Sequence, residues 1–376
     1  MNKLLLGTTA LVGASILMAG AAYAAKPKVT VKAYVKFEVL GSSQDLEAIT
    51  GNAPNRGYGF ATDSEVTVEG DGVTDAGMKW KAHIEMETDA GSSGNDETWI
   101  RFSGSWGQIN LGSEDGAEDL MQHGAQKAHT AGDGGVDGDW VDAIDWNAVN
   151  GRLVPSAKLD QDSSDAVKAT YFTPRVGGLQ LGVSFTPDTD TKGRSISGDQ
   201  DGKFESSWGI GVNFVKKIGG ANVAISAVGH IAESEVKKTV TVINSNTSTT
   251  TFSRAEDLRA WAVGASVGYG NWRVGANYQD NGDGGESTGG LDSTSFAVGV
   301  GYSQGPVNLG VSYLHSEVED SAGGEDEGDA VVVGATYSLG GGASVYGDFF
   351  WFDTEDQAGV GVNDGVGFLI GTAVKF

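Results

Sequence analysis

Residues 30–39 read TVKAYVKFEV, with an apolar residue at every odd position and a polar residue at nearly every even one. A β-strand places alternate residues on opposite faces, so this stretch predicts a strand with one apolar and one polar face. The same alternation recurs in residues 78–87, 272–279 and 366–376. A comparable 3.6-residue period occurs only around residues 114–130. We therefore expect an all-β chain.

About sixteen such runs follow one another, and their connections alternate between tight turns and long acidic segments. The long connections cover residues 40–61, 88–97, 114–165, 187–206, 232–257, 280–294, 316–329 and 353–364. Short and long connections that alternate over an even number of strands place all turns at one end of the sheet and all long loops at the other. This layout predicts a transmembrane antiparallel β-barrel over residues 25–376, with short periplasmic turns and long extracellular loops.

A soluble sandwich is the alternative, and the distribution of aromatic residues argues against it. The apolar faces carry aromatic residues near both strand ends, as in a barrel with two girdles around a lipid band. These residues are Trp261, Tyr269, Trp272, Tyr278, Phe296 and Tyr302. A barrel also explains why 59 of 376 residues are Gly and only 39% are hydrophobic. Lipid solvates the outward side chains, and about 16 strands enclose water rather than a packed core.

The first 24 residues have the three parts of a secretory signal peptide. Lys3 provides the basic start, an apolar stretch follows, and the A-x-A pattern ends at Ala24, so we expect cleavage before Ala25. An uncleaved membrane anchor is the alternative, but the apolar run is shorter than a spanning helix requires. The expected location is therefore outside the cytoplasm.

The net charge of -25 and the absence of Cys exclude several functions. Nucleic-acid binding requires a basic surface, so we expect no nucleic-acid partner. Cys nucleophiles, disulfides and thiolate metal sites are also excluded. The five His show no arrangement with Ser and Asp that is typical of catalysis, so we expect no enzyme. His123 and His129 lack a carboxylate at a metal-site spacing, so we expect no metal site and no cofactor.

Three segments carry a family resemblance. Residues 99–120, WIRFSGSWGQINLGSEDGAEDL, residues 178–187, GLQLGVSFTP, and the C-terminal Phe376 resemble the trimeric general porins of Gram-negative outer membranes, especially the alphaproteobacterial type. The resemblance implies a homotrimer in the cell outer membrane, passive diffusion of small hydrophilic solutes, and an assembly machinery that reads Phe376. Gly112 is followed by Ser113, where this family commonly has an arginine at the edge of the pore.

The resemblance also implies that the third long connection, here called loop 3 (residues 114–165), folds into the lumen and narrows it. Its segment 114–128 can form a short helix, and apolar residues could anchor it to the wall: Leu120, Met121, Trp140, Ile144 and Trp146. We expect its acids to line the constriction: Glu114, Asp115, Glu118 and Asp119. We expect a basic wall opposite them: Lys32, Lys36, Lys79, Lys81 and Arg101. A solvent-exposed acidic loop is the alternative.

The same bases could instead pair with inward acids of the neighbouring strands, namely Glu38, Glu65, Glu69, Glu85 and Glu87. The function expected from these features is a general diffusion channel with a modest preference for cations. A substrate-specific channel, or a barrel enzyme or adhesion scaffold, are the alternatives. The expected partners are membrane lipid and lipopolysaccharide. Acidic extracellular loops such as residues 188–199 leave calcium binding open, although Lys192 occupies a ligand position of a calcium loop.

Overall fold

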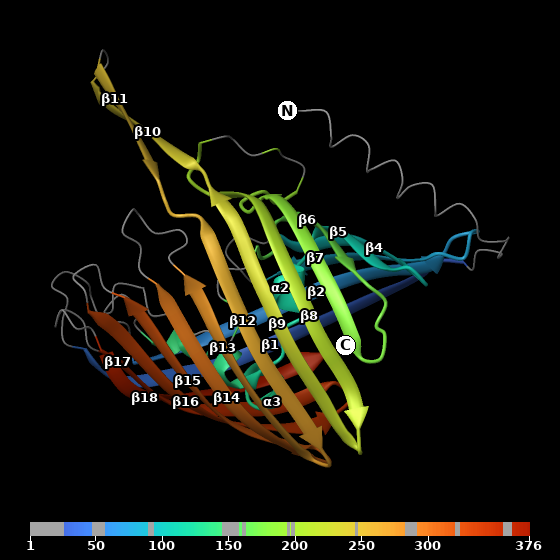
Figure 1. Ribbon diagram of the computed structural model, residues 1–376. Coiled ribbons are helices and arrows are strands. Elements are labelled where there is room, and N and C mark those ends of the chain that lie inside the picture. Colours follow the sequence, from blue (N-terminus) through green and yellow to red (C-terminus); the bar gives the residue numbers. More distant parts are fainter. Residues whose placement is uncertain are drawn as a thin grey trace.

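The computed structural model describes residues 26–46, 57–88, 94–144, 158–159, 163–193, 196, 200–244, 247–282, 292–319, 324–355 and 363–376 (Figure 1). The expected signal peptide, its cleavage residues Ala24 and Ala25, and the anchor Trp146 lie outside these residues. Sixteen strands form one closed antiparallel barrel in the order β1-β18-β17-β16-β15-β14-β13-β12-β9-β8-β7-β6-β5-β4-β3-β2. This confirms the predicted fold class and strand number.

The strands of the first half of the barrel are β1 (Lys28–Leu46), β2 (Tyr58–Val73), β3 (Lys79–Glu87), β4 (Asn95–Gly104), β5 (Gly107–Ser113), β6 (Val167–Phe172), β7 (Leu179–Asp188) and β8 (Phe204–Ile218). Those of the second half are β9 (Ala221–Ser234), β12 (Leu258–Tyr269), β13 (Trp272–Gly282), β14 (Ser293–Gln304), β15 (Val307–Glu319), β16 (Glu325–Gly340), β17 (Ala343–Glu355) and β18 (Asn363–Lys375).

The barrel closes where its first strand meets its last. Val35 of β1 lies opposite Ser64 of β2 on one side and Val374 of β18 on the other. Beyond β18, Phe376 exchanges two backbone hydrogen bonds with Ala33, of 2.7 and 2.9 Å. A ring without edge strands leaves no row of backbone N–H and C=O groups to face lipid, which is the condition for spanning a membrane with strands.

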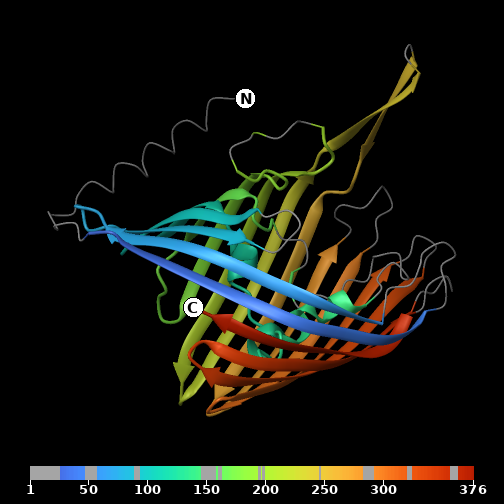
Figure 2. The same cartoon turned by 180° about the vertical axis from the view of Figure 1, so that it is seen from behind.

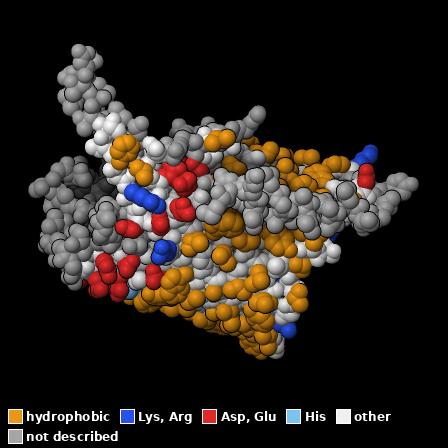
Figure 3. Space-filling view, turned by 45° about the horizontal axis from the view of Figure 1, so that its top comes forward, with side chains coloured by type: hydrophobic (Ala, Val, Ile, Leu, Met, Phe, Trp, Pro, Cys, Tyr) orange, Lys and Arg blue, Asp and Glu red, His pale blue; other side chains and the backbone are white. Residues whose placement is uncertain are grey.

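The outward face of the barrel is apolar and carries aromatic residues at two heights. Trp272 packs on Tyr302 with ring centroids 4.8 Å apart near the turn end, and Trp261 packs on Tyr278 at 5.6 Å near the loop end. Valines and alanines lie between the two levels. Figure 3 shows apolar side chains covering the outside, while acidic side chains gather toward the end from which a hairpin projects.

An outward row of ionisable residues marks where the apolar band ends. His315 lies opposite Asp329, Asp329 opposite Asp353, Asp353 opposite Asp364, and Asp364 opposite Asp45. These five residues, here called the outer acidic row, occupy five neighbouring strands at one level of the register. Carboxylates are not tolerated in hydrocarbon, so the lipid core must end below this row.

Two regions differ from the strand boundaries that the sequence predicts. β1 and β2 extend past residues 39 and 62, because the regular alternation of apolar and polar residues ends there: Leu40 follows Val39 directly, and only a glycine separates Tyr58 from Phe60. The expected loop 232–257 contains a two-stranded hairpin, β10 (Val236–Asn244) and β11 (Thr247–Arg254), that projects from the barrel (Figure 1). Val and Thr, which favour strands, are frequent in this hairpin, but its residues do not form a long run with one apolar and one polar face.

In its described residues, loop 3 contains four short helical segments, two of them within residues 114–128, where one helix was predicted. They are α2 (Ala117–Leu120), α3 (Ala125–Ala128), η2 (Gly135–Asp137) and η3 (Asp139–Ala143). Gly124 has a φ of -179°, an extended conformation that separates α2 from α3. Among the described residues, no helix is long and apolar enough to cross a membrane.

The lipid-facing assignment of the barrel exterior can be tested at Val298, which lies between Phe296 and Tyr302 on β14 and is 43% exposed. Val298→Arg places a guanidinium at mid-depth. We expect this change to lower the free energy of unfolding in lipid vesicles by about 2–4 kcal/mol, which means a less stable barrel. Urea-dependent unfolding in vesicles measures this change. Val298→Leu keeps an apolar side chain there and should fold like the parent. Equal stability of the Arg and Leu variants would contradict the assignment.

Candidate pore constriction

Loop 3 lies directly on the inner wall because the wall beneath it consists largely of glycine. A Cβ at Gly264 would overlap the carbonyl of His123, one at Gly275 the carbonyl of Gly124, and one at Gly310 the ring of His129. We call the wall glycines in contact with loop 3 the glycine seat: Gly182, Gly209, Gly211, Gly264, Gly275, Gly299, Gly301, Gly310 and Gly334. The seat extends from β7 to β16, so loop and wall approach each other at backbone distance.

Polar side chains between these glycines accept hydrogen bonds from the backbone of loop 3. Ser184 Oγ accepts from the N–H of Ala117 (2.6 Å), and Asn277 Oδ1 accepts from the N–H of Ala125 (3.0 Å). These two N–H groups open the short helices α2 and α3, where a helix lacks internal partners. Further along the loop, Asp348 Oδ2 accepts from the N–H of Asp133 (2.7 Å).

Two apolar clusters complete the attachment of the loop. Trp140 is buried against Phe350, with ring centroids 5.4 Å apart, and Ile144 belongs to the same cluster. Met121 is buried in a second cluster with Phe172. The structure therefore confirms Met121, Trp140 and Ile144 as anchors. Leu120 is 44% exposed and was wrongly expected to be one, because it lies on the side of α2 turned away from the wall.

Loop 3 follows the wall around most of the lumen. α2 contacts β6 to β9, α3 contacts β12 to β14, η2 contacts β15 and β16, and η3 reaches β18 and β1. Figures 1 and 2 both show these helical segments inside the ring of strands. The inner face of β2 to β5 remains uncovered by these segments. In the described part of loop 3, the wall that remains open to the lumen is therefore that of β2 to β5.

Lys36 connects this wall to loop 3. Its Nζ lies 2.9 Å from Asp63 on β2 and 3.1 and 3.4 Å from Asp133 and Asp139 of loop 3. Nearby, Glu38 accepts a hydrogen bond of 2.6 Å from the Tyr346 hydroxyl. One ammonium group thus faces several carboxylates, in a polar cavity of about 450 Å³ whose lining includes Lys36, Asp133 and Tyr346.

The other bases of the predicted wall also face acids. Arg101 binds Glu114 at 2.9 Å, but Glu114 directly follows β5, the neighbour of β4, so this pair lies on one wall and not across the constriction. Lys32 and Lys81 both bind Glu69, at 2.8 and 2.6 Å, which is the alternative pairing with inward acids. Lys79 is exposed near the turn end of β3.

The four acids expected to line the pore lie in different environments. Glu114 joins the Arg101 pair, and Asp119 lies 3.4 Å from Lys158 of the same loop. Glu118 has no exposed surface: its Oε1 accepts a hydrogen bond from Ser163 and its other oxygen lies on Gly209. Asp115 is half-buried beside it. Glu118 therefore attaches the loop to the wall, while the carboxylates that meet Lys36 are Asp133 and Asp139.

Burial and neighbouring charges alter the protonation of several loop 3 residues. Burial, reinforced by the nearby Asp133, raises the pKa of Asp139 to about 6. Burial also raises the pKa of Glu114, although Arg101 acts in the opposite direction. For His129, burial lowers the pKa to about 4, so its imidazole is neutral at pH 7. The charge of the constriction therefore depends on pH mainly through its buried acids.

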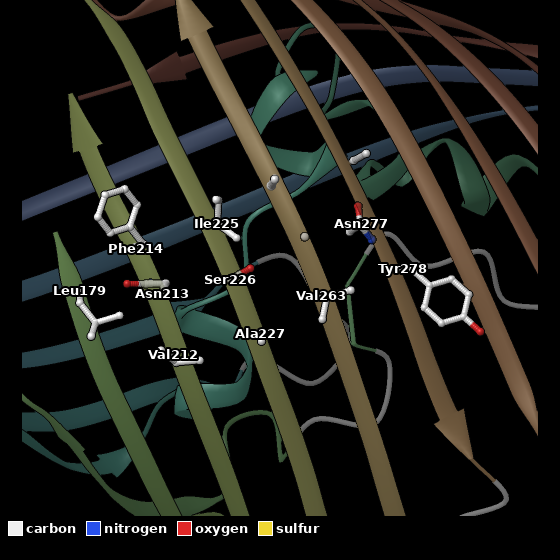
Figure 4. A pocket seen from close by; sticks show the side chains of 13 residues that line it. Leu179, Val212, Asn213, Phe214, Ile225, Ser226, Ala227, Val263, Asn277 and Tyr278 are labelled. Carbon is white, nitrogen blue, oxygen red and sulfur yellow. The ribbon is translucent and has the colours of Figure 1, made fainter. Parts of the chain in front are cut away.

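An apolar groove of about 650 Å³ lies on the other side of the wall, over β7, β8, β9, β12 and β13 (Figure 4). Its floor is formed by the small residues Ala227, Ala265 and Ala276, and larger side chains such as Phe214 and Tyr278 border it. By their register these residues point outward. The groove therefore belongs to the lipid-facing surface and not to the passage.

Several residues of the constriction are not predicted by any pattern in the sequence. Asp133 and Asp139 lie in the non-periodic part of loop 3, where no pattern indicates which carboxylates face the lumen. Lys158 joins Asp119 from the far end of the same loop. The glycine seat has a signal in the sequence, because its members occupy inward positions of strands with an alternating residue pattern. The pairs 209/211 and 299/301 are recognisable there as small inward residues.

Comparison with known proteins agrees with this geometry. A family model described as Gram-negative porin matches residues 7–357. An uncharacterized protein of Rickettsia conorii is 26% identical, with 79% of this chain and 80% of that protein covered.

Solved structures share the fold at low sequence identity. A loop L8 deletion mutant of the Vibrio cholerae outer membrane protein OmpT has a TM-score of 0.65 at 15% identity, covering 94% of this chain and 100% of that one. An anion-selective porin from Comamonas acidovorans has a TM-score of 0.61 at 15% identity, covering 93% and 100%.

The contact between loop 3 and the glycine seat can be tested at Gly310. Gly310→Ala adds a methyl group that overlaps the His129 ring, so the loop must shift away from β15. We expect higher single-channel conductance with more flicker, because the loop loses its fixed position. Gly59→Ala is the matched control, since a Cβ there meets no atom within 4 Å. Planar-bilayer recordings compare the two, and parent-like conductance of both variants would show that the seat does not position the loop.

Proposed function

We propose that this chain, which belongs to the family of Gram-negative porins and forms a diffusion channel in the outer membrane, is a general channel with a modest preference for cations. The observation that carries the preference is the surroundings of Lys36. This lysine is the base closest to loop 3 on β1, and its ammonium group contacts three carboxylates within 3.4 Å. Its positive charge is therefore more than compensated at the narrow part of the passage.

The remaining charges along the passage support the same sign. Arg101 is neutralised by Glu114, and Lys32 and Lys81 share Glu69, which leaves other inward acids on β2 to β4, such as Glu65, Glu85 and Glu97. A fold comparison cannot decide the sign, because an anion-selective porin has the same fold. A pore lined by excess negative charge enriches cations and lowers their barrier to passage.

The arrangement of aromatic residues favours a general over a substrate-specific channel. Phe172 packs beneath Met121, and Phe350 packs beneath Trp140, so both are covered by loop 3. Tyr34 and Tyr346 remain near the passage and bind carboxylates through their hydroxyls. In the described part of the chain, these rings form no continuous apolar file along the passage. We likewise propose that the barrel itself is the functional unit, and not a platform for a catalytic site.

The outer acidic row supports the proposal that lipopolysaccharide is a lipid partner. His315, Asp329, Asp353, Asp364 and Asp45 face outward at the upper limit of the apolar band. Lipid phosphates at that level carry the same sign as these carboxylates, so divalent cations would have to bridge the two. The acidic segment 188–199 gives less support for calcium binding, because Asp190 is engaged by Lys203 at 3.5 Å and Asp199 lies outside the described residues.

We propose that the mature protein begins at Ala25 and forms a homotrimer. We also propose that the outer-membrane assembly machinery recognises Phe376. We expect the outer-membrane protein to migrate as a trimer in unheated detergent gels and as a monomer after boiling. Chemical crosslinking should give the trimer as its largest product, and the intact mass should start at Ala25. Migration as a monomer without heating, together with no crosslinked trimer, would exclude the oligomer. An intact mass that retains residues 1–24 would exclude cleavage.

The cation preference can be tested by replacing the loop 3 acids that face Lys36. In Asp133→Asn/Asp139→Asn, we expect the reversal potential in a KCl gradient to shift toward the anion value. Asp139 has a pKa of about 6 and loses its charge as the pH falls, so the parent should become less cation-selective between pH 7.5 and pH 5. The double variant should show a smaller pH effect.

The matched control for this experiment is Asp75→Asn, which removes an exposed acid at the turn between β2 and β3. It should keep the reversal potential of the parent at both pH values. Anion selectivity of the parent at pH 7.5 and low salt would contradict the proposed preference. Equal potentials of parent and double variant would show that other charges determine it.

A further inference from the structure

A histidine and two glutamates meet on the inner wall, outside the group around Lys36. His83 and Glu85 belong to β3 and Glu97 belongs to β4. One ligand atom from each of the three lies within 4.8 Å of the other two. His83 is only 8% exposed, whereas both glutamates are half-buried and reach the lumen. Imidazole and carboxylate groups together are typical ligands of first-row divalent metals.

The distances within this group suit one small ion. His83 Nε2 lies 3.0 Å from Glu85 Oε2 and 3.7 Å from Glu97 Oε2. In a tetrahedral zinc site with bonds of about 2.0–2.1 Å, two ligand atoms are about 3.4 Å apart. The two observed distances lie on either side of this value. Three protein ligands leave a fourth position for water, and the lumen supplies it.

Neighbouring residues fix the orientation of each ligand. The His83 ring stacks on Trp99, with centroids 4.6 Å apart and an angle of 4° between the planes. Its other nitrogen, Nδ1, has no hydrogen-bond partner, is buried, and faces Glu69 Oε1 at 3.6 Å. Metal-binding histidines usually donate their second N–H to a carboxylate, and Glu69, whose Oε1 is held by Lys81 at 2.6 Å, is the carboxylate beside Nδ1. Trp99 also donates a hydrogen bond of 2.9 Å to Glu97.

Two similar groups in the chain lack this geometry. His315 also has two acidic neighbours, but Glu317 lies at Nε2 and Asp329 at Nδ1, both 3.0 Å away. Carboxylates on opposite ring nitrogens cannot bind the same ion as the imidazole. Glu38, Asp133 and Asp139 also converge, but the Lys36 ammonium already lies between the last two.

We propose that His83, Glu85 and Glu97 bind a divalent first-row metal ion such as Zn²⁺ in the wall of the channel, with Glu69 as the carboxylate that orients His83. A bound ion adds two positive charges beside the open passage on β2 to β5. It therefore reduces the excess of negative charge there and lowers the flux of cations. Metal binding does not depend on the proposed cation preference, because it can be measured without any current.

The direct test is calorimetric titration of ZnCl₂ into the detergent-solubilised protein at pH 7.5. We expect saturable binding that is at least tenfold weaker in His83→Gln, because the variant loses the imidazole ligand. Asp75→Asn, which changes an exposed acid at the turn between β2 and β3, is the control and should bind like the parent. Glu97→Gln keeps the His83–Trp99 stack and should also weaken binding, which covers the case in which His83→Gln does not fold. MgCl₂ should not reproduce the effect, since Mg²⁺ prefers oxygen ligands.

Planar-bilayer recordings locate the bound ion. Micromolar ZnCl₂ should lower the single-channel conductance of the parent and of Asp75→Asn, and EDTA should restore it. The half-effective ZnCl₂ concentration should rise at least tenfold in His83→Gln. Binding unaffected by His83→Gln and Glu97→Gln would overturn the site. Binding that depends on His83 but leaves the conductance unchanged would overturn its placement beside the conducting path.

Discussion

The direct contact between the backbone of loop 3 and the glycine seat controls the geometry of this channel. A side chain at Gly264, Gly275 or Gly310 would occupy the space now filled by the loop. Because the loop follows the wall as far as β18 and β1, its acids Asp133 and Asp139 reach Lys36 on β1. The wall glycines thus explain part of the high glycine content of the chain. Because they have no side chains, a 16-strand barrel can hold a long internal segment and still leave a passage for water.

The charges of the passage are arranged as local groups and not as two opposed walls. Arg101 pairs with Glu114 at the start of loop 3, and Lys36 joins β1 and β2 to its middle part. Each group combines a base with at least one acid, so the field inside the lumen changes sign over short distances. In the proposed cation preference a surplus of acids sets the net sign, and the buried position of Asp139 makes this surplus depend on pH.

The sequence predicted the fold well because membrane strands must alternate between lipid and water. Strand number, closure and the aromatic levels follow from that rule. The loop anchors follow instead from apolar residues in a loop that the family resemblance places inside the lumen. The rule fails where the alternation ends, as in the upper parts of β1 and β2 and in the projecting hairpin β10–β11. The site was harder to predict. Inward positions identified Lys36 and Arg101, but their partners depend on the irregular path of loop 3. Glu85 and His83 share one face of β3, but the register that brings Glu97 of β4 to them includes an irregularity between Ile84 and Met86.

The extent of the glycine seat also orders the events by which the channel forms. Loop 3 follows β5 in the chain, yet Gly132 binds Thr336 and Asp133 binds Asp348, more than 200 residues later. The binding surface for these two residues does not exist until β16 and β17 have joined the ring. The middle of the loop can therefore take its final position only after these contacts of very long sequence separation have formed, whereas the surface for α2 on β6 to β9 exists earlier. The bore of a newly closed barrel is fully narrowed only when residues 132–133 reach β16 and β17.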